Sequence, residues 1–172
     1  MTAATAHLLI VAVGAIAYPY LYDVLVAIAY GFLFPAIAVL QVRHATVRQS
    51  GAILGTLTGA AVATVGLAGS ANVDVRPASL FVLGMWWWTI GKLWAQTGIL
   101  PRSFGRITAG LGLVAFVLVP VEAFSPAFIA MMPRSLADVL AQPYFSAAHV
   151  TLAVWLFVLA WQLMRHPDPA TA

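Results

Sequence analysis

Residues 51–69 read Gly-Ala-Ile-Leu-Gly-Thr-Leu-Thr-Gly-Ala-Ala-Val-Ala-Thr-Val-Gly-Leu-Ala-Gly, with no charged side chain. A helix of about 20 such residues crosses the hydrocarbon core of a bilayer, so this stretch predicts a transmembrane helix. Small residues recur every four positions at Gly51, Gly55, Gly59 and Ala63. This spacing places them on one helix face, where a second backbone can approach closely. We expect the face to pack against another helix, within the chain or between protomers.

The composition of the whole chain agrees with that segment. Hydrophobic residues make up 63% and charged residues 8%, whereas soluble domains carry about 25% charged residues. The apolar runs are continuous and do not alternate with polar residues, which favours helices over a barrel. The chain has no cysteine, which excludes disulfides and thiolate chemistry, and its net charge of +3 is too small and scattered to indicate nucleic acid. The fold predicted is all-α: a polytopic integral membrane helical bundle forming a single domain over residues 1–172.

Six segments have the length and polarity of membrane spans. They lie near residues 5–18, 24–40, 51–69, 80–97, 107–124 and 147–164. Residues 1–7 contain no lysine or arginine, which argues against a cleaved signal peptide and for a first span that is retained. The first two segments must turn within residues 18–23; one long kinked helix, giving five spans, is the alternative.

Charge placement orients the spans. With six spans, one side receives Arg43, Arg48, Arg102, Arg106 and Arg165, with Lys92 able to reach it, and the other side receives Arg76 and Arg134. The side richer in basic residues is the cytoplasmic one. Both termini are therefore expected in the cytoplasm. The richness in Ala, Val, Gly and Trp points to a bacterial cytoplasmic membrane.

The longest outer connection is expected from residue 125 to residue 145. Within it, Ser135-Leu136-Ala137-Asp138 has the pattern of a helix start, and Pro133 and Pro143 bound the segment. We expect a short interfacial helix near residues 134–141, serving as a connector or as a lid.

Four side chains on the outer side are candidates for catalysis. Asp23, Glu122 and His149 are expected at a similar depth, and Arg134 could position an anionic group. Ionisable groups in apolar segments are costly and therefore indicate function. The alternative is structural, because Asp23 can cap a helix and the others can be solvated at the interface. No metal site is predicted.

The tryptophan-rich span supplies candidate ligand-binding residues, namely Trp87, Trp88, Trp94 and Lys92. Residues 86–88 are consecutive tryptophans, so they cannot all share one helix face. Such a wall suits a flat hydrophobic molecule, although packing within the bundle is the alternative. Trp88, Lys92 and Gln96 share one stripe, and Lys92 is expected to extend to the inner face or to stack on an aromatic ring.

The remaining histidines, His7, His44 and His166, are expected at the cytoplasmic boundary. No two histidines are expected to face each other across the bilayer at mid-depth, which weakens a b-type haem interpretation, and no cofactor is assigned. Phosphate-binding glycine loops and serine-nucleophile motifs are absent from the sequence.

Residues 92–106 read Lys-Leu-Trp-Ala-Gln-Thr-Gly-Ile-Leu-Pro-Arg-Ser-Phe-Gly-Arg and lead into a glycine-rich span ending near Gly112. This stretch resembles a cytoplasmic junction of uncharacterised six-span bacterial membrane proteins, and the last span, with Val154-Trp155-Leu156, is similar too. The resemblance implies topology and no activity. It also has a physical origin, since Gly98 suits a helix end and Pro101 a turn.

Three functions remain open from the sequence. The leading one is a non-catalytic component that binds a hydrophobic small molecule or lipid, or that joins a homo-oligomer or larger membrane complex. The second is a membrane enzyme acting on a lipid-like substrate at the outer face through Asp23, Glu122 and His149. The third is a small carrier of solutes or protons.

Overall fold

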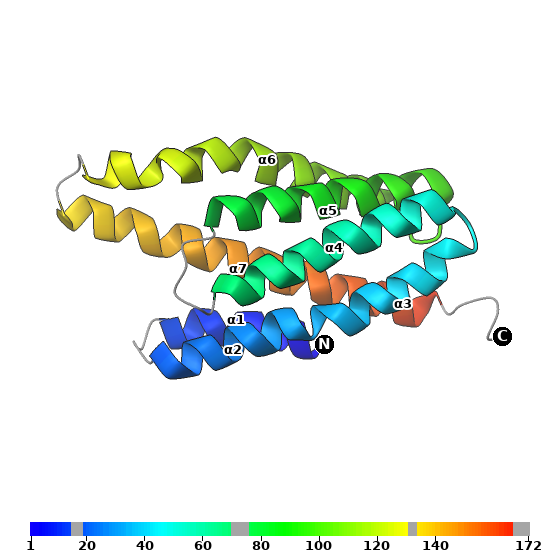
Figure 1. Cartoon of the computed structure of the whole chain (residues 1–172), viewed down its shortest axis with the longest axis horizontal. Helices are drawn as coiled ribbons and strands as arrows, with labels where there is room; N and C mark the ends of the chain where they lie inside the picture. The colour runs from blue at the N-terminus through cyan, green and yellow to red at the C-terminus, as the bar shows by residue number, and fades with distance from the viewer. Residues whose placement is uncertain (15–18, 70–75, 131–133, 167–172) are drawn as a thin grey trace.

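The computed structural model describes residues 1–14, 19–69, 76–130 and 134–166, and within these ranges the chain is α-helical with short turns and no strand. The helices are α1 (Thr2–Gly14), α2 (Pro19–Gly31), α3 (Leu33–Ala45), α4 (Gln49–Gly69), α5 (Arg76–Thr97), α6 (Arg102–Ala130) and α7 (Arg134–Arg165). They lie side by side as an elongated bundle (Figure 1). The prediction of an all-helical fold is confirmed.

Four stretches are long and apolar enough to cross a membrane. They are Leu21–Ala45, Gln49–Gly69, Arg102–Val121 and Ala147–Arg165. Helix α5 has 22 residues, but its tryptophans, Lys92 and Gln96 make it less apolar than these four. Helix α1 has 13 residues, which gives it a length of about 20 Å. The chain is therefore a helical protein suited to a membrane.

Helices α2 and α3 run end to end (Figure 1). Their junction at Phe32 keeps a helical hydrogen bond, in which the Phe32 amide donates to the Ile28 carbonyl over 3.1 Å. Pro35 has no N–H to offer the carbonyl of Gly31, which accounts for the interruption between the two helices. Helix α1 is separate and packs on α2, with Ala6 and Ile10 buried in one cluster with α2 side chains.

The outer connection differs from its prediction. Helix α6 continues to Ala130 and α7 begins at Arg134, so residues 134–141 form the first turns of α7 instead of a separate interfacial helix. Pro143, expected to end that helix, lies within α7. Prolines are tolerated inside transmembrane helices, where neighbours and small adjustments satisfy the freed carbonyl. The ends of α6 and α7 project beyond the other helices (Figure 1).

The tightest helix pair is the α5–α6 hairpin. Its glycines recur every seven residues, at positions 84, 91, 98, 105 and 112. Gly98 forms the turn with a φ of 71°, and its amide donates to the Trp94 carbonyl over 2.9 Å. A Cβ on Gly105 would lie 2.5 Å from the Ala95 nitrogen, and one on Gly112 would lie 2.6 Å from the Trp88 nitrogen. The backbones are in contact, and the predicted helix end at Gly98 is confirmed.

The small-residue face of α4 packs against α5 within the same chain. A Cβ on Gly51 would lie 2.8 Å from Leu93 Cδ1. One on Gly59 would lie 2.8 Å from the indole nitrogen of Trp86. Gly55 faces Ile90 in the same way, and Ala63 is buried.

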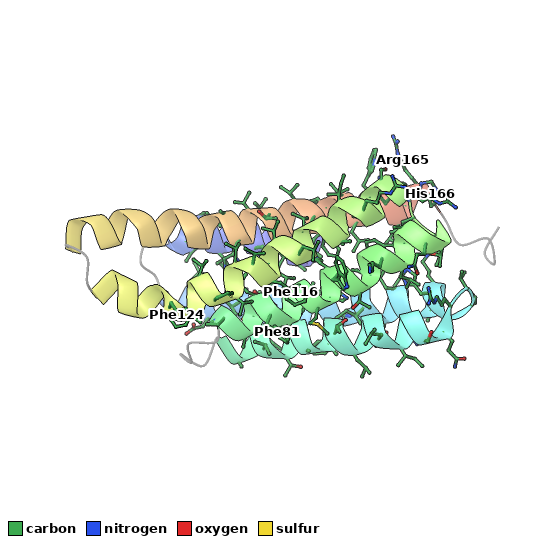
Figure 2. The ribbon with its side chains drawn as sticks, turned by 90° about the horizontal axis from the view of Figure 1, so that it is seen from above. Phe81, Phe116, Phe124, Arg165 and His166 are labelled. Atoms are coloured by element: carbon green, nitrogen blue, oxygen red, sulfur yellow. The ribbon has the colours of Figure 1, made fainter. Side chains whose placement is uncertain are left out.

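Several described basic side chains, those of Arg43, Arg48 and Arg165, gather at one end of the bundle (Figure 2). This end brings together the α3–α4 turn, the α5–α6 turn and the end of α7 (Figure 1). Arg165 lies at this end, and Phe124 lies toward the opposite end (Figure 2). The Arg43 guanidinium donates to the His166 carbonyl, which ties α3 to α7. Arg48 Nη1 donates to Gln96 Oε1 over 2.5 Å. We call this region the basic end.

Candidate functional site

An aromatic cluster fills the bundle near its basic end. Its members are Trp86, Trp87 and Trp94 of α5, Phe104 of α6 and Trp155 of α7, all of them buried. Trp155 is central: its ring centroid lies between 5.3 and 6.4 Å from those of the other four. The cluster joins three helices through ring contacts.

Two indole hydrogen bonds anchor the cluster to its surroundings. Trp94 Nε1 donates to His44 Nε2 over 2.6 Å, and Trp155 Nε1 donates to Thr108 Oγ1 over 3.0 Å. Because His44 Nε2 accepts, its Nδ1 carries the proton and donates to the Leu40 carbonyl over 2.5 Å. Both nitrogens of His44 are satisfied, so this buried histidine holds α3 against α5.

The tryptophans predicted as a ligand wall divide into two groups. Trp87 and Trp94 are 4% and 0% exposed, and other aromatic rings occupy their faces. A nearby cavity between α3, α4 and α5 measures about 10 Å³, which is the room of about one water. This cavity, between described parts of α3, α4 and α5, is too small for a large ligand.

Trp88 and Lys92 instead lie on the outward side of α5. Trp88 is partly exposed and Lys92 exposed, and Lys92 Nζ lies 4.2 Å from the centroid of the Trp88 ring. Of the two placements expected for Lys92, the structure shows the one on an aromatic ring.

An outer stripe follows the same side of α5. We define it as Phe81, Met85, Trp88, Lys92 and Gln96, which recur at intervals of three or four residues. Phe81 is half exposed and its ring centroid lies 5.7 Å from that of Phe116 on α6, as Figure 2 shows. The stripe is thus aromatic at one end and cationic at the basic end.

A pair of buried histidines joins α1 to α7. His7 Nδ1 lies 2.9 Å from His149 Nδ1, and the two residues are 0% and 8% exposed. The Tyr30 ring meets His7 edge-on with a centroid distance of 5.1 Å. This contact was not expected from the sequence, and the placement of His7 at the cytoplasmic boundary stays a prediction. A histidine within an apolar run is the signal that could have identified the site.

The predicted outer acidic set is only partly described. Asp23 lies on α2 and is half-buried. Glu122 lies on α6 and Arg134 begins α7, but their side chains fall outside the described part of the chain. Among the side chains that are described, His, Asp and Glu residues do not gather in groups of three or more.

His44, Thr108 and Trp155 anchor the aromatic cluster but were not among the site residues predicted from the sequence. Their roles depend on which helices are neighbours, and a hydropathy pattern does not contain that information. Comparison of the chain with known protein families, curated proteins and solved structures finds no match.

Proposed function

We propose that the chain is a non-catalytic component of a bacterial cytoplasmic membrane that binds a hydrophobic molecule with an acidic head group. The observation that carries the proposal is the placement of Lys92, whose ammonium stands 4.2 Å from the Trp88 ring centroid on the exposed side of α5. The outer stripe is the binding surface. Its aromatic end contacts the hydrocarbon part of the ligand and its cationic end contacts the head group.

The burial of Trp87 and Trp94 supports a ligand on the exposed side of α5. Trp87 and Trp94 are committed to the aromatic cluster, whereas Phe81, Lys92 and Gln96 are exposed. From Phe81 to Lys92 the helix rises about 16 Å, a length that matches much of one acyl chain within a leaflet about 15 Å deep.

Charge at the basic end supports an acidic head group. Lys92 is exposed and Arg48 approaches the same end of the stripe through its bond to Gln96. Basic side chains next to transmembrane helices attract anionic lipids with about 1 kcal/mol for each charge. A phospholipid or another acidic amphiphile has the required chemistry, and the same exposed apolar surface could receive a second subunit.

Native mass spectrometry of gently extracted protein tests the binding surface. We expect Lys92→Gln and Trp88→Leu each to lower the retained anionic lipid or other acidic amphiphile about fivefold, because each removes about 1 kcal/mol of contact. The matched control is the pair of Arg165 and Trp161, whose guanidinium carbon lies 4.2 Å from the ring centroid.

Equal losses in Arg165→Gln and Trp161→Leu would show general lipid attraction and contradict a specific surface. A bare mass for the unaltered protein would contradict ligand binding altogether. A second polypeptide in the spectrum, with no bound amphiphile, would favour the subunit function over the lipid-binding one.

We further propose six spans with both termini in the cytoplasm, with α1 and α5 added to the four apolar stretches. The cysteine-free chain suits single-cysteine labelling. An impermeant thiol reagent should label Ser103→Cys in inverted vesicles only and Ala68→Cys in intact spheroplasts only. Ser103 lies at the basic end, and Ala68 lies at the opposite end of α4. Labelling of both positions from the same side would contradict this topology.

A further inference from the structure

We propose that Arg48, Lys92 and Gln96 together bind the phosphodiester of an anionic glycerophospholipid. The three side chains lie where the outer stripe reaches the basic end, with Lys92 and Gln96 on α5 and Arg48 just before α4. The inference rests on the proposed function and narrows it. It names phosphate as the acidic group, and it brings a residue from outside α5 into the binding surface.

The bond between Arg48 and Gln96 determines what Gln96 offers to a ligand. Arg48 Nη1 donates to Gln96 Oε1 over 2.5 Å, so the acceptor of the carboxamide faces the guanidinium. The Gln96 amide nitrogen then keeps its N–H donors for other partners, and so do the guanidinium nitrogens that this bond leaves unused. Both residues are exposed. The outward edge of the pair therefore presents donors, which suit an anion.

Lys92 adds a positive charge beside this pair. It precedes Gln96 by one helical turn, so the two residues lie on the same face of α5 with Cβ atoms about 5–6 Å apart. Helical side chains lean toward the N-terminus, which brings Gln96 over the turn that carries Lys92. Lys92 Nζ contacts the face of the Trp88 ring, 4.2 Å from its centroid, and the exposed ammonium keeps N–H donors for a ligand.

The described side chains place no carboxylate beside these cations. Asp23 lies on α2, and the helical rise from Asp23 to Arg43 places it about 30 Å from the basic end. Cationic side chains without an acidic partner attract an anion, and anionic lipids supply that charge at the cytoplasmic surface of a membrane. The local charge therefore favours a lipid head group as the occupant.

The chemistry of the three groups favours a phosphodiester over the carboxylate of a fatty acid. A guanidinium matches two phosphate oxygens at once, and a lysine ammonium binds phosphate as a point charge. A carboxyl group close to the hydrocarbon is partly neutralised, because a low dielectric disfavours its charged form. A phosphodiester is a much stronger acid and stays ionised. Donors from two segments of the chain also suit a tetrahedral phosphate better than a planar carboxylate.

The rest of the outer stripe matches the rest of such a lipid. Trp88 lies about 6 Å deeper along α5 than Lys92, at the level of the glycerol esters, where tryptophan is favoured. Phe81 lies about 10 Å deeper again and is paired with Phe116, at the level of an acyl chain. Figure 2 shows these two phenylalanines side by side, away from the basic end.

The test titrates delipidated full-length protein in detergent and counts the bound molecules by native mass spectrometry. Its probes are phosphatidylglycerol, oleic acid and glycerol phosphate, which has no acyl chain. We expect phosphatidylglycerol to bind at least about fivefold more tightly than oleic acid, because the cations retain a fully charged partner. Glycerol phosphate should not compete measurably, because it lacks the chain that contacts the stripe.

Gln96→Glu is the decisive variant. It keeps the shape of the side chain and the acceptor that faces Arg48, but it replaces the amide donors by a negative charge. Binding of phosphatidylglycerol should fall about tenfold, because like charges then meet. Gln162→Glu is the matched control, because it adds the same charge to a partly exposed residue near the end of α7. That change should alter binding less than about twofold, since salt screens a charge on another helix.

Equal binding of phosphatidylglycerol and oleic acid, or equal losses in Gln96→Glu and Gln162→Glu, would overturn the phosphodiester site and leave amphiphile binding by the outer stripe intact. Competition by glycerol phosphate as strong as that of the lipid would overturn it too, because the ligand would then be a soluble phosphate ester. Failure of all three probes to bind would contradict the proposed function as well.

Discussion

Trp155→Ala is expected to lower the free energy of unfolding by about 4 kcal/mol, because large-to-small changes at buried tryptophans leave a cavity and forfeit contacts. Trp155 is 3% exposed and its ring touches four other members of the aromatic cluster. Its loss also leaves Thr108 Oγ1 without the indole donor. Unfolding in mixed detergent micelles, followed by far-UV circular dichroism, measures the change.

Trp161 provides the control on the same helix. It is 51% exposed, and its ring makes a cation–π contact with Arg165. Trp161→Ala should cost less than about 1 kcal/mol, because an exposed cation–π contact is worth about 0.5–1 kcal/mol. Similar losses for the two variants would contradict a packed role for Trp155.

Gly91→Ala is expected to destabilise the protein by about 3 kcal/mol, the upper part of the usual range for overpacking. A Cβ at Gly91 would lie 2.7 Å from the Gly105 carbonyl oxygen and 2.9 Å from Ala109 Cα. Those atoms belong to the backbone of α6 and cannot rotate away, so the two helices must separate. Unfolding of this variant in mixed detergent micelles, followed by far-UV circular dichroism, measures the change in the free energy of unfolding.

Gly110→Ala is the matched control for that change. Gly110 also lies in the hairpin, on α6, but a Cβ there meets nothing within 4 Å. Alanine favours a helix over glycine by about 1 kcal/mol, so this variant should be neutral or slightly stabilised. Equal free energies of unfolding for Gly91→Ala and Gly110→Ala would contradict the close backbone contact between α5 and α6.

Local features of the fold could be predicted from the sequence. The apolar runs mark the helices, and Gly98 followed by Pro101 marks the turn between α5 and α6, because both effects depend on a few neighbouring residues. The contact between Lys92 and Trp88 is of the same kind, since residues four apart on a helix are adjacent.

Pairings between distant helices could not be predicted in this way. His7 and His149 lie 142 positions apart, and nearly every face of these helices is apolar, so hydropathy does not show which face meets which helix. Prolines were a second source of error. Pro143 suggested a helix end, but α7 passes through it, as transmembrane helices can.

The glycine repeat of α5 and α6 was visible in the sequence but has meaning only in an antiparallel pair. Gly84 faces Gly112 and Gly91 faces Gly105, and in each pair the two residues are equally distant from Gly98. Periodicity within one helix does not reveal this symmetry, because it arises only when the chain reverses at Gly98.

That symmetry has a consequence for how the protein is made. Contacts that are mirrored about a turn form between residues close in sequence, and such local contacts form quickly during folding. We expect α5 and α6 to associate as a hairpin during biosynthesis, before α7 has been synthesised. Sliding one helix along the other by a single residue would bring side chains against the opposing backbone, so the glycines also fix the register at which the later helices dock.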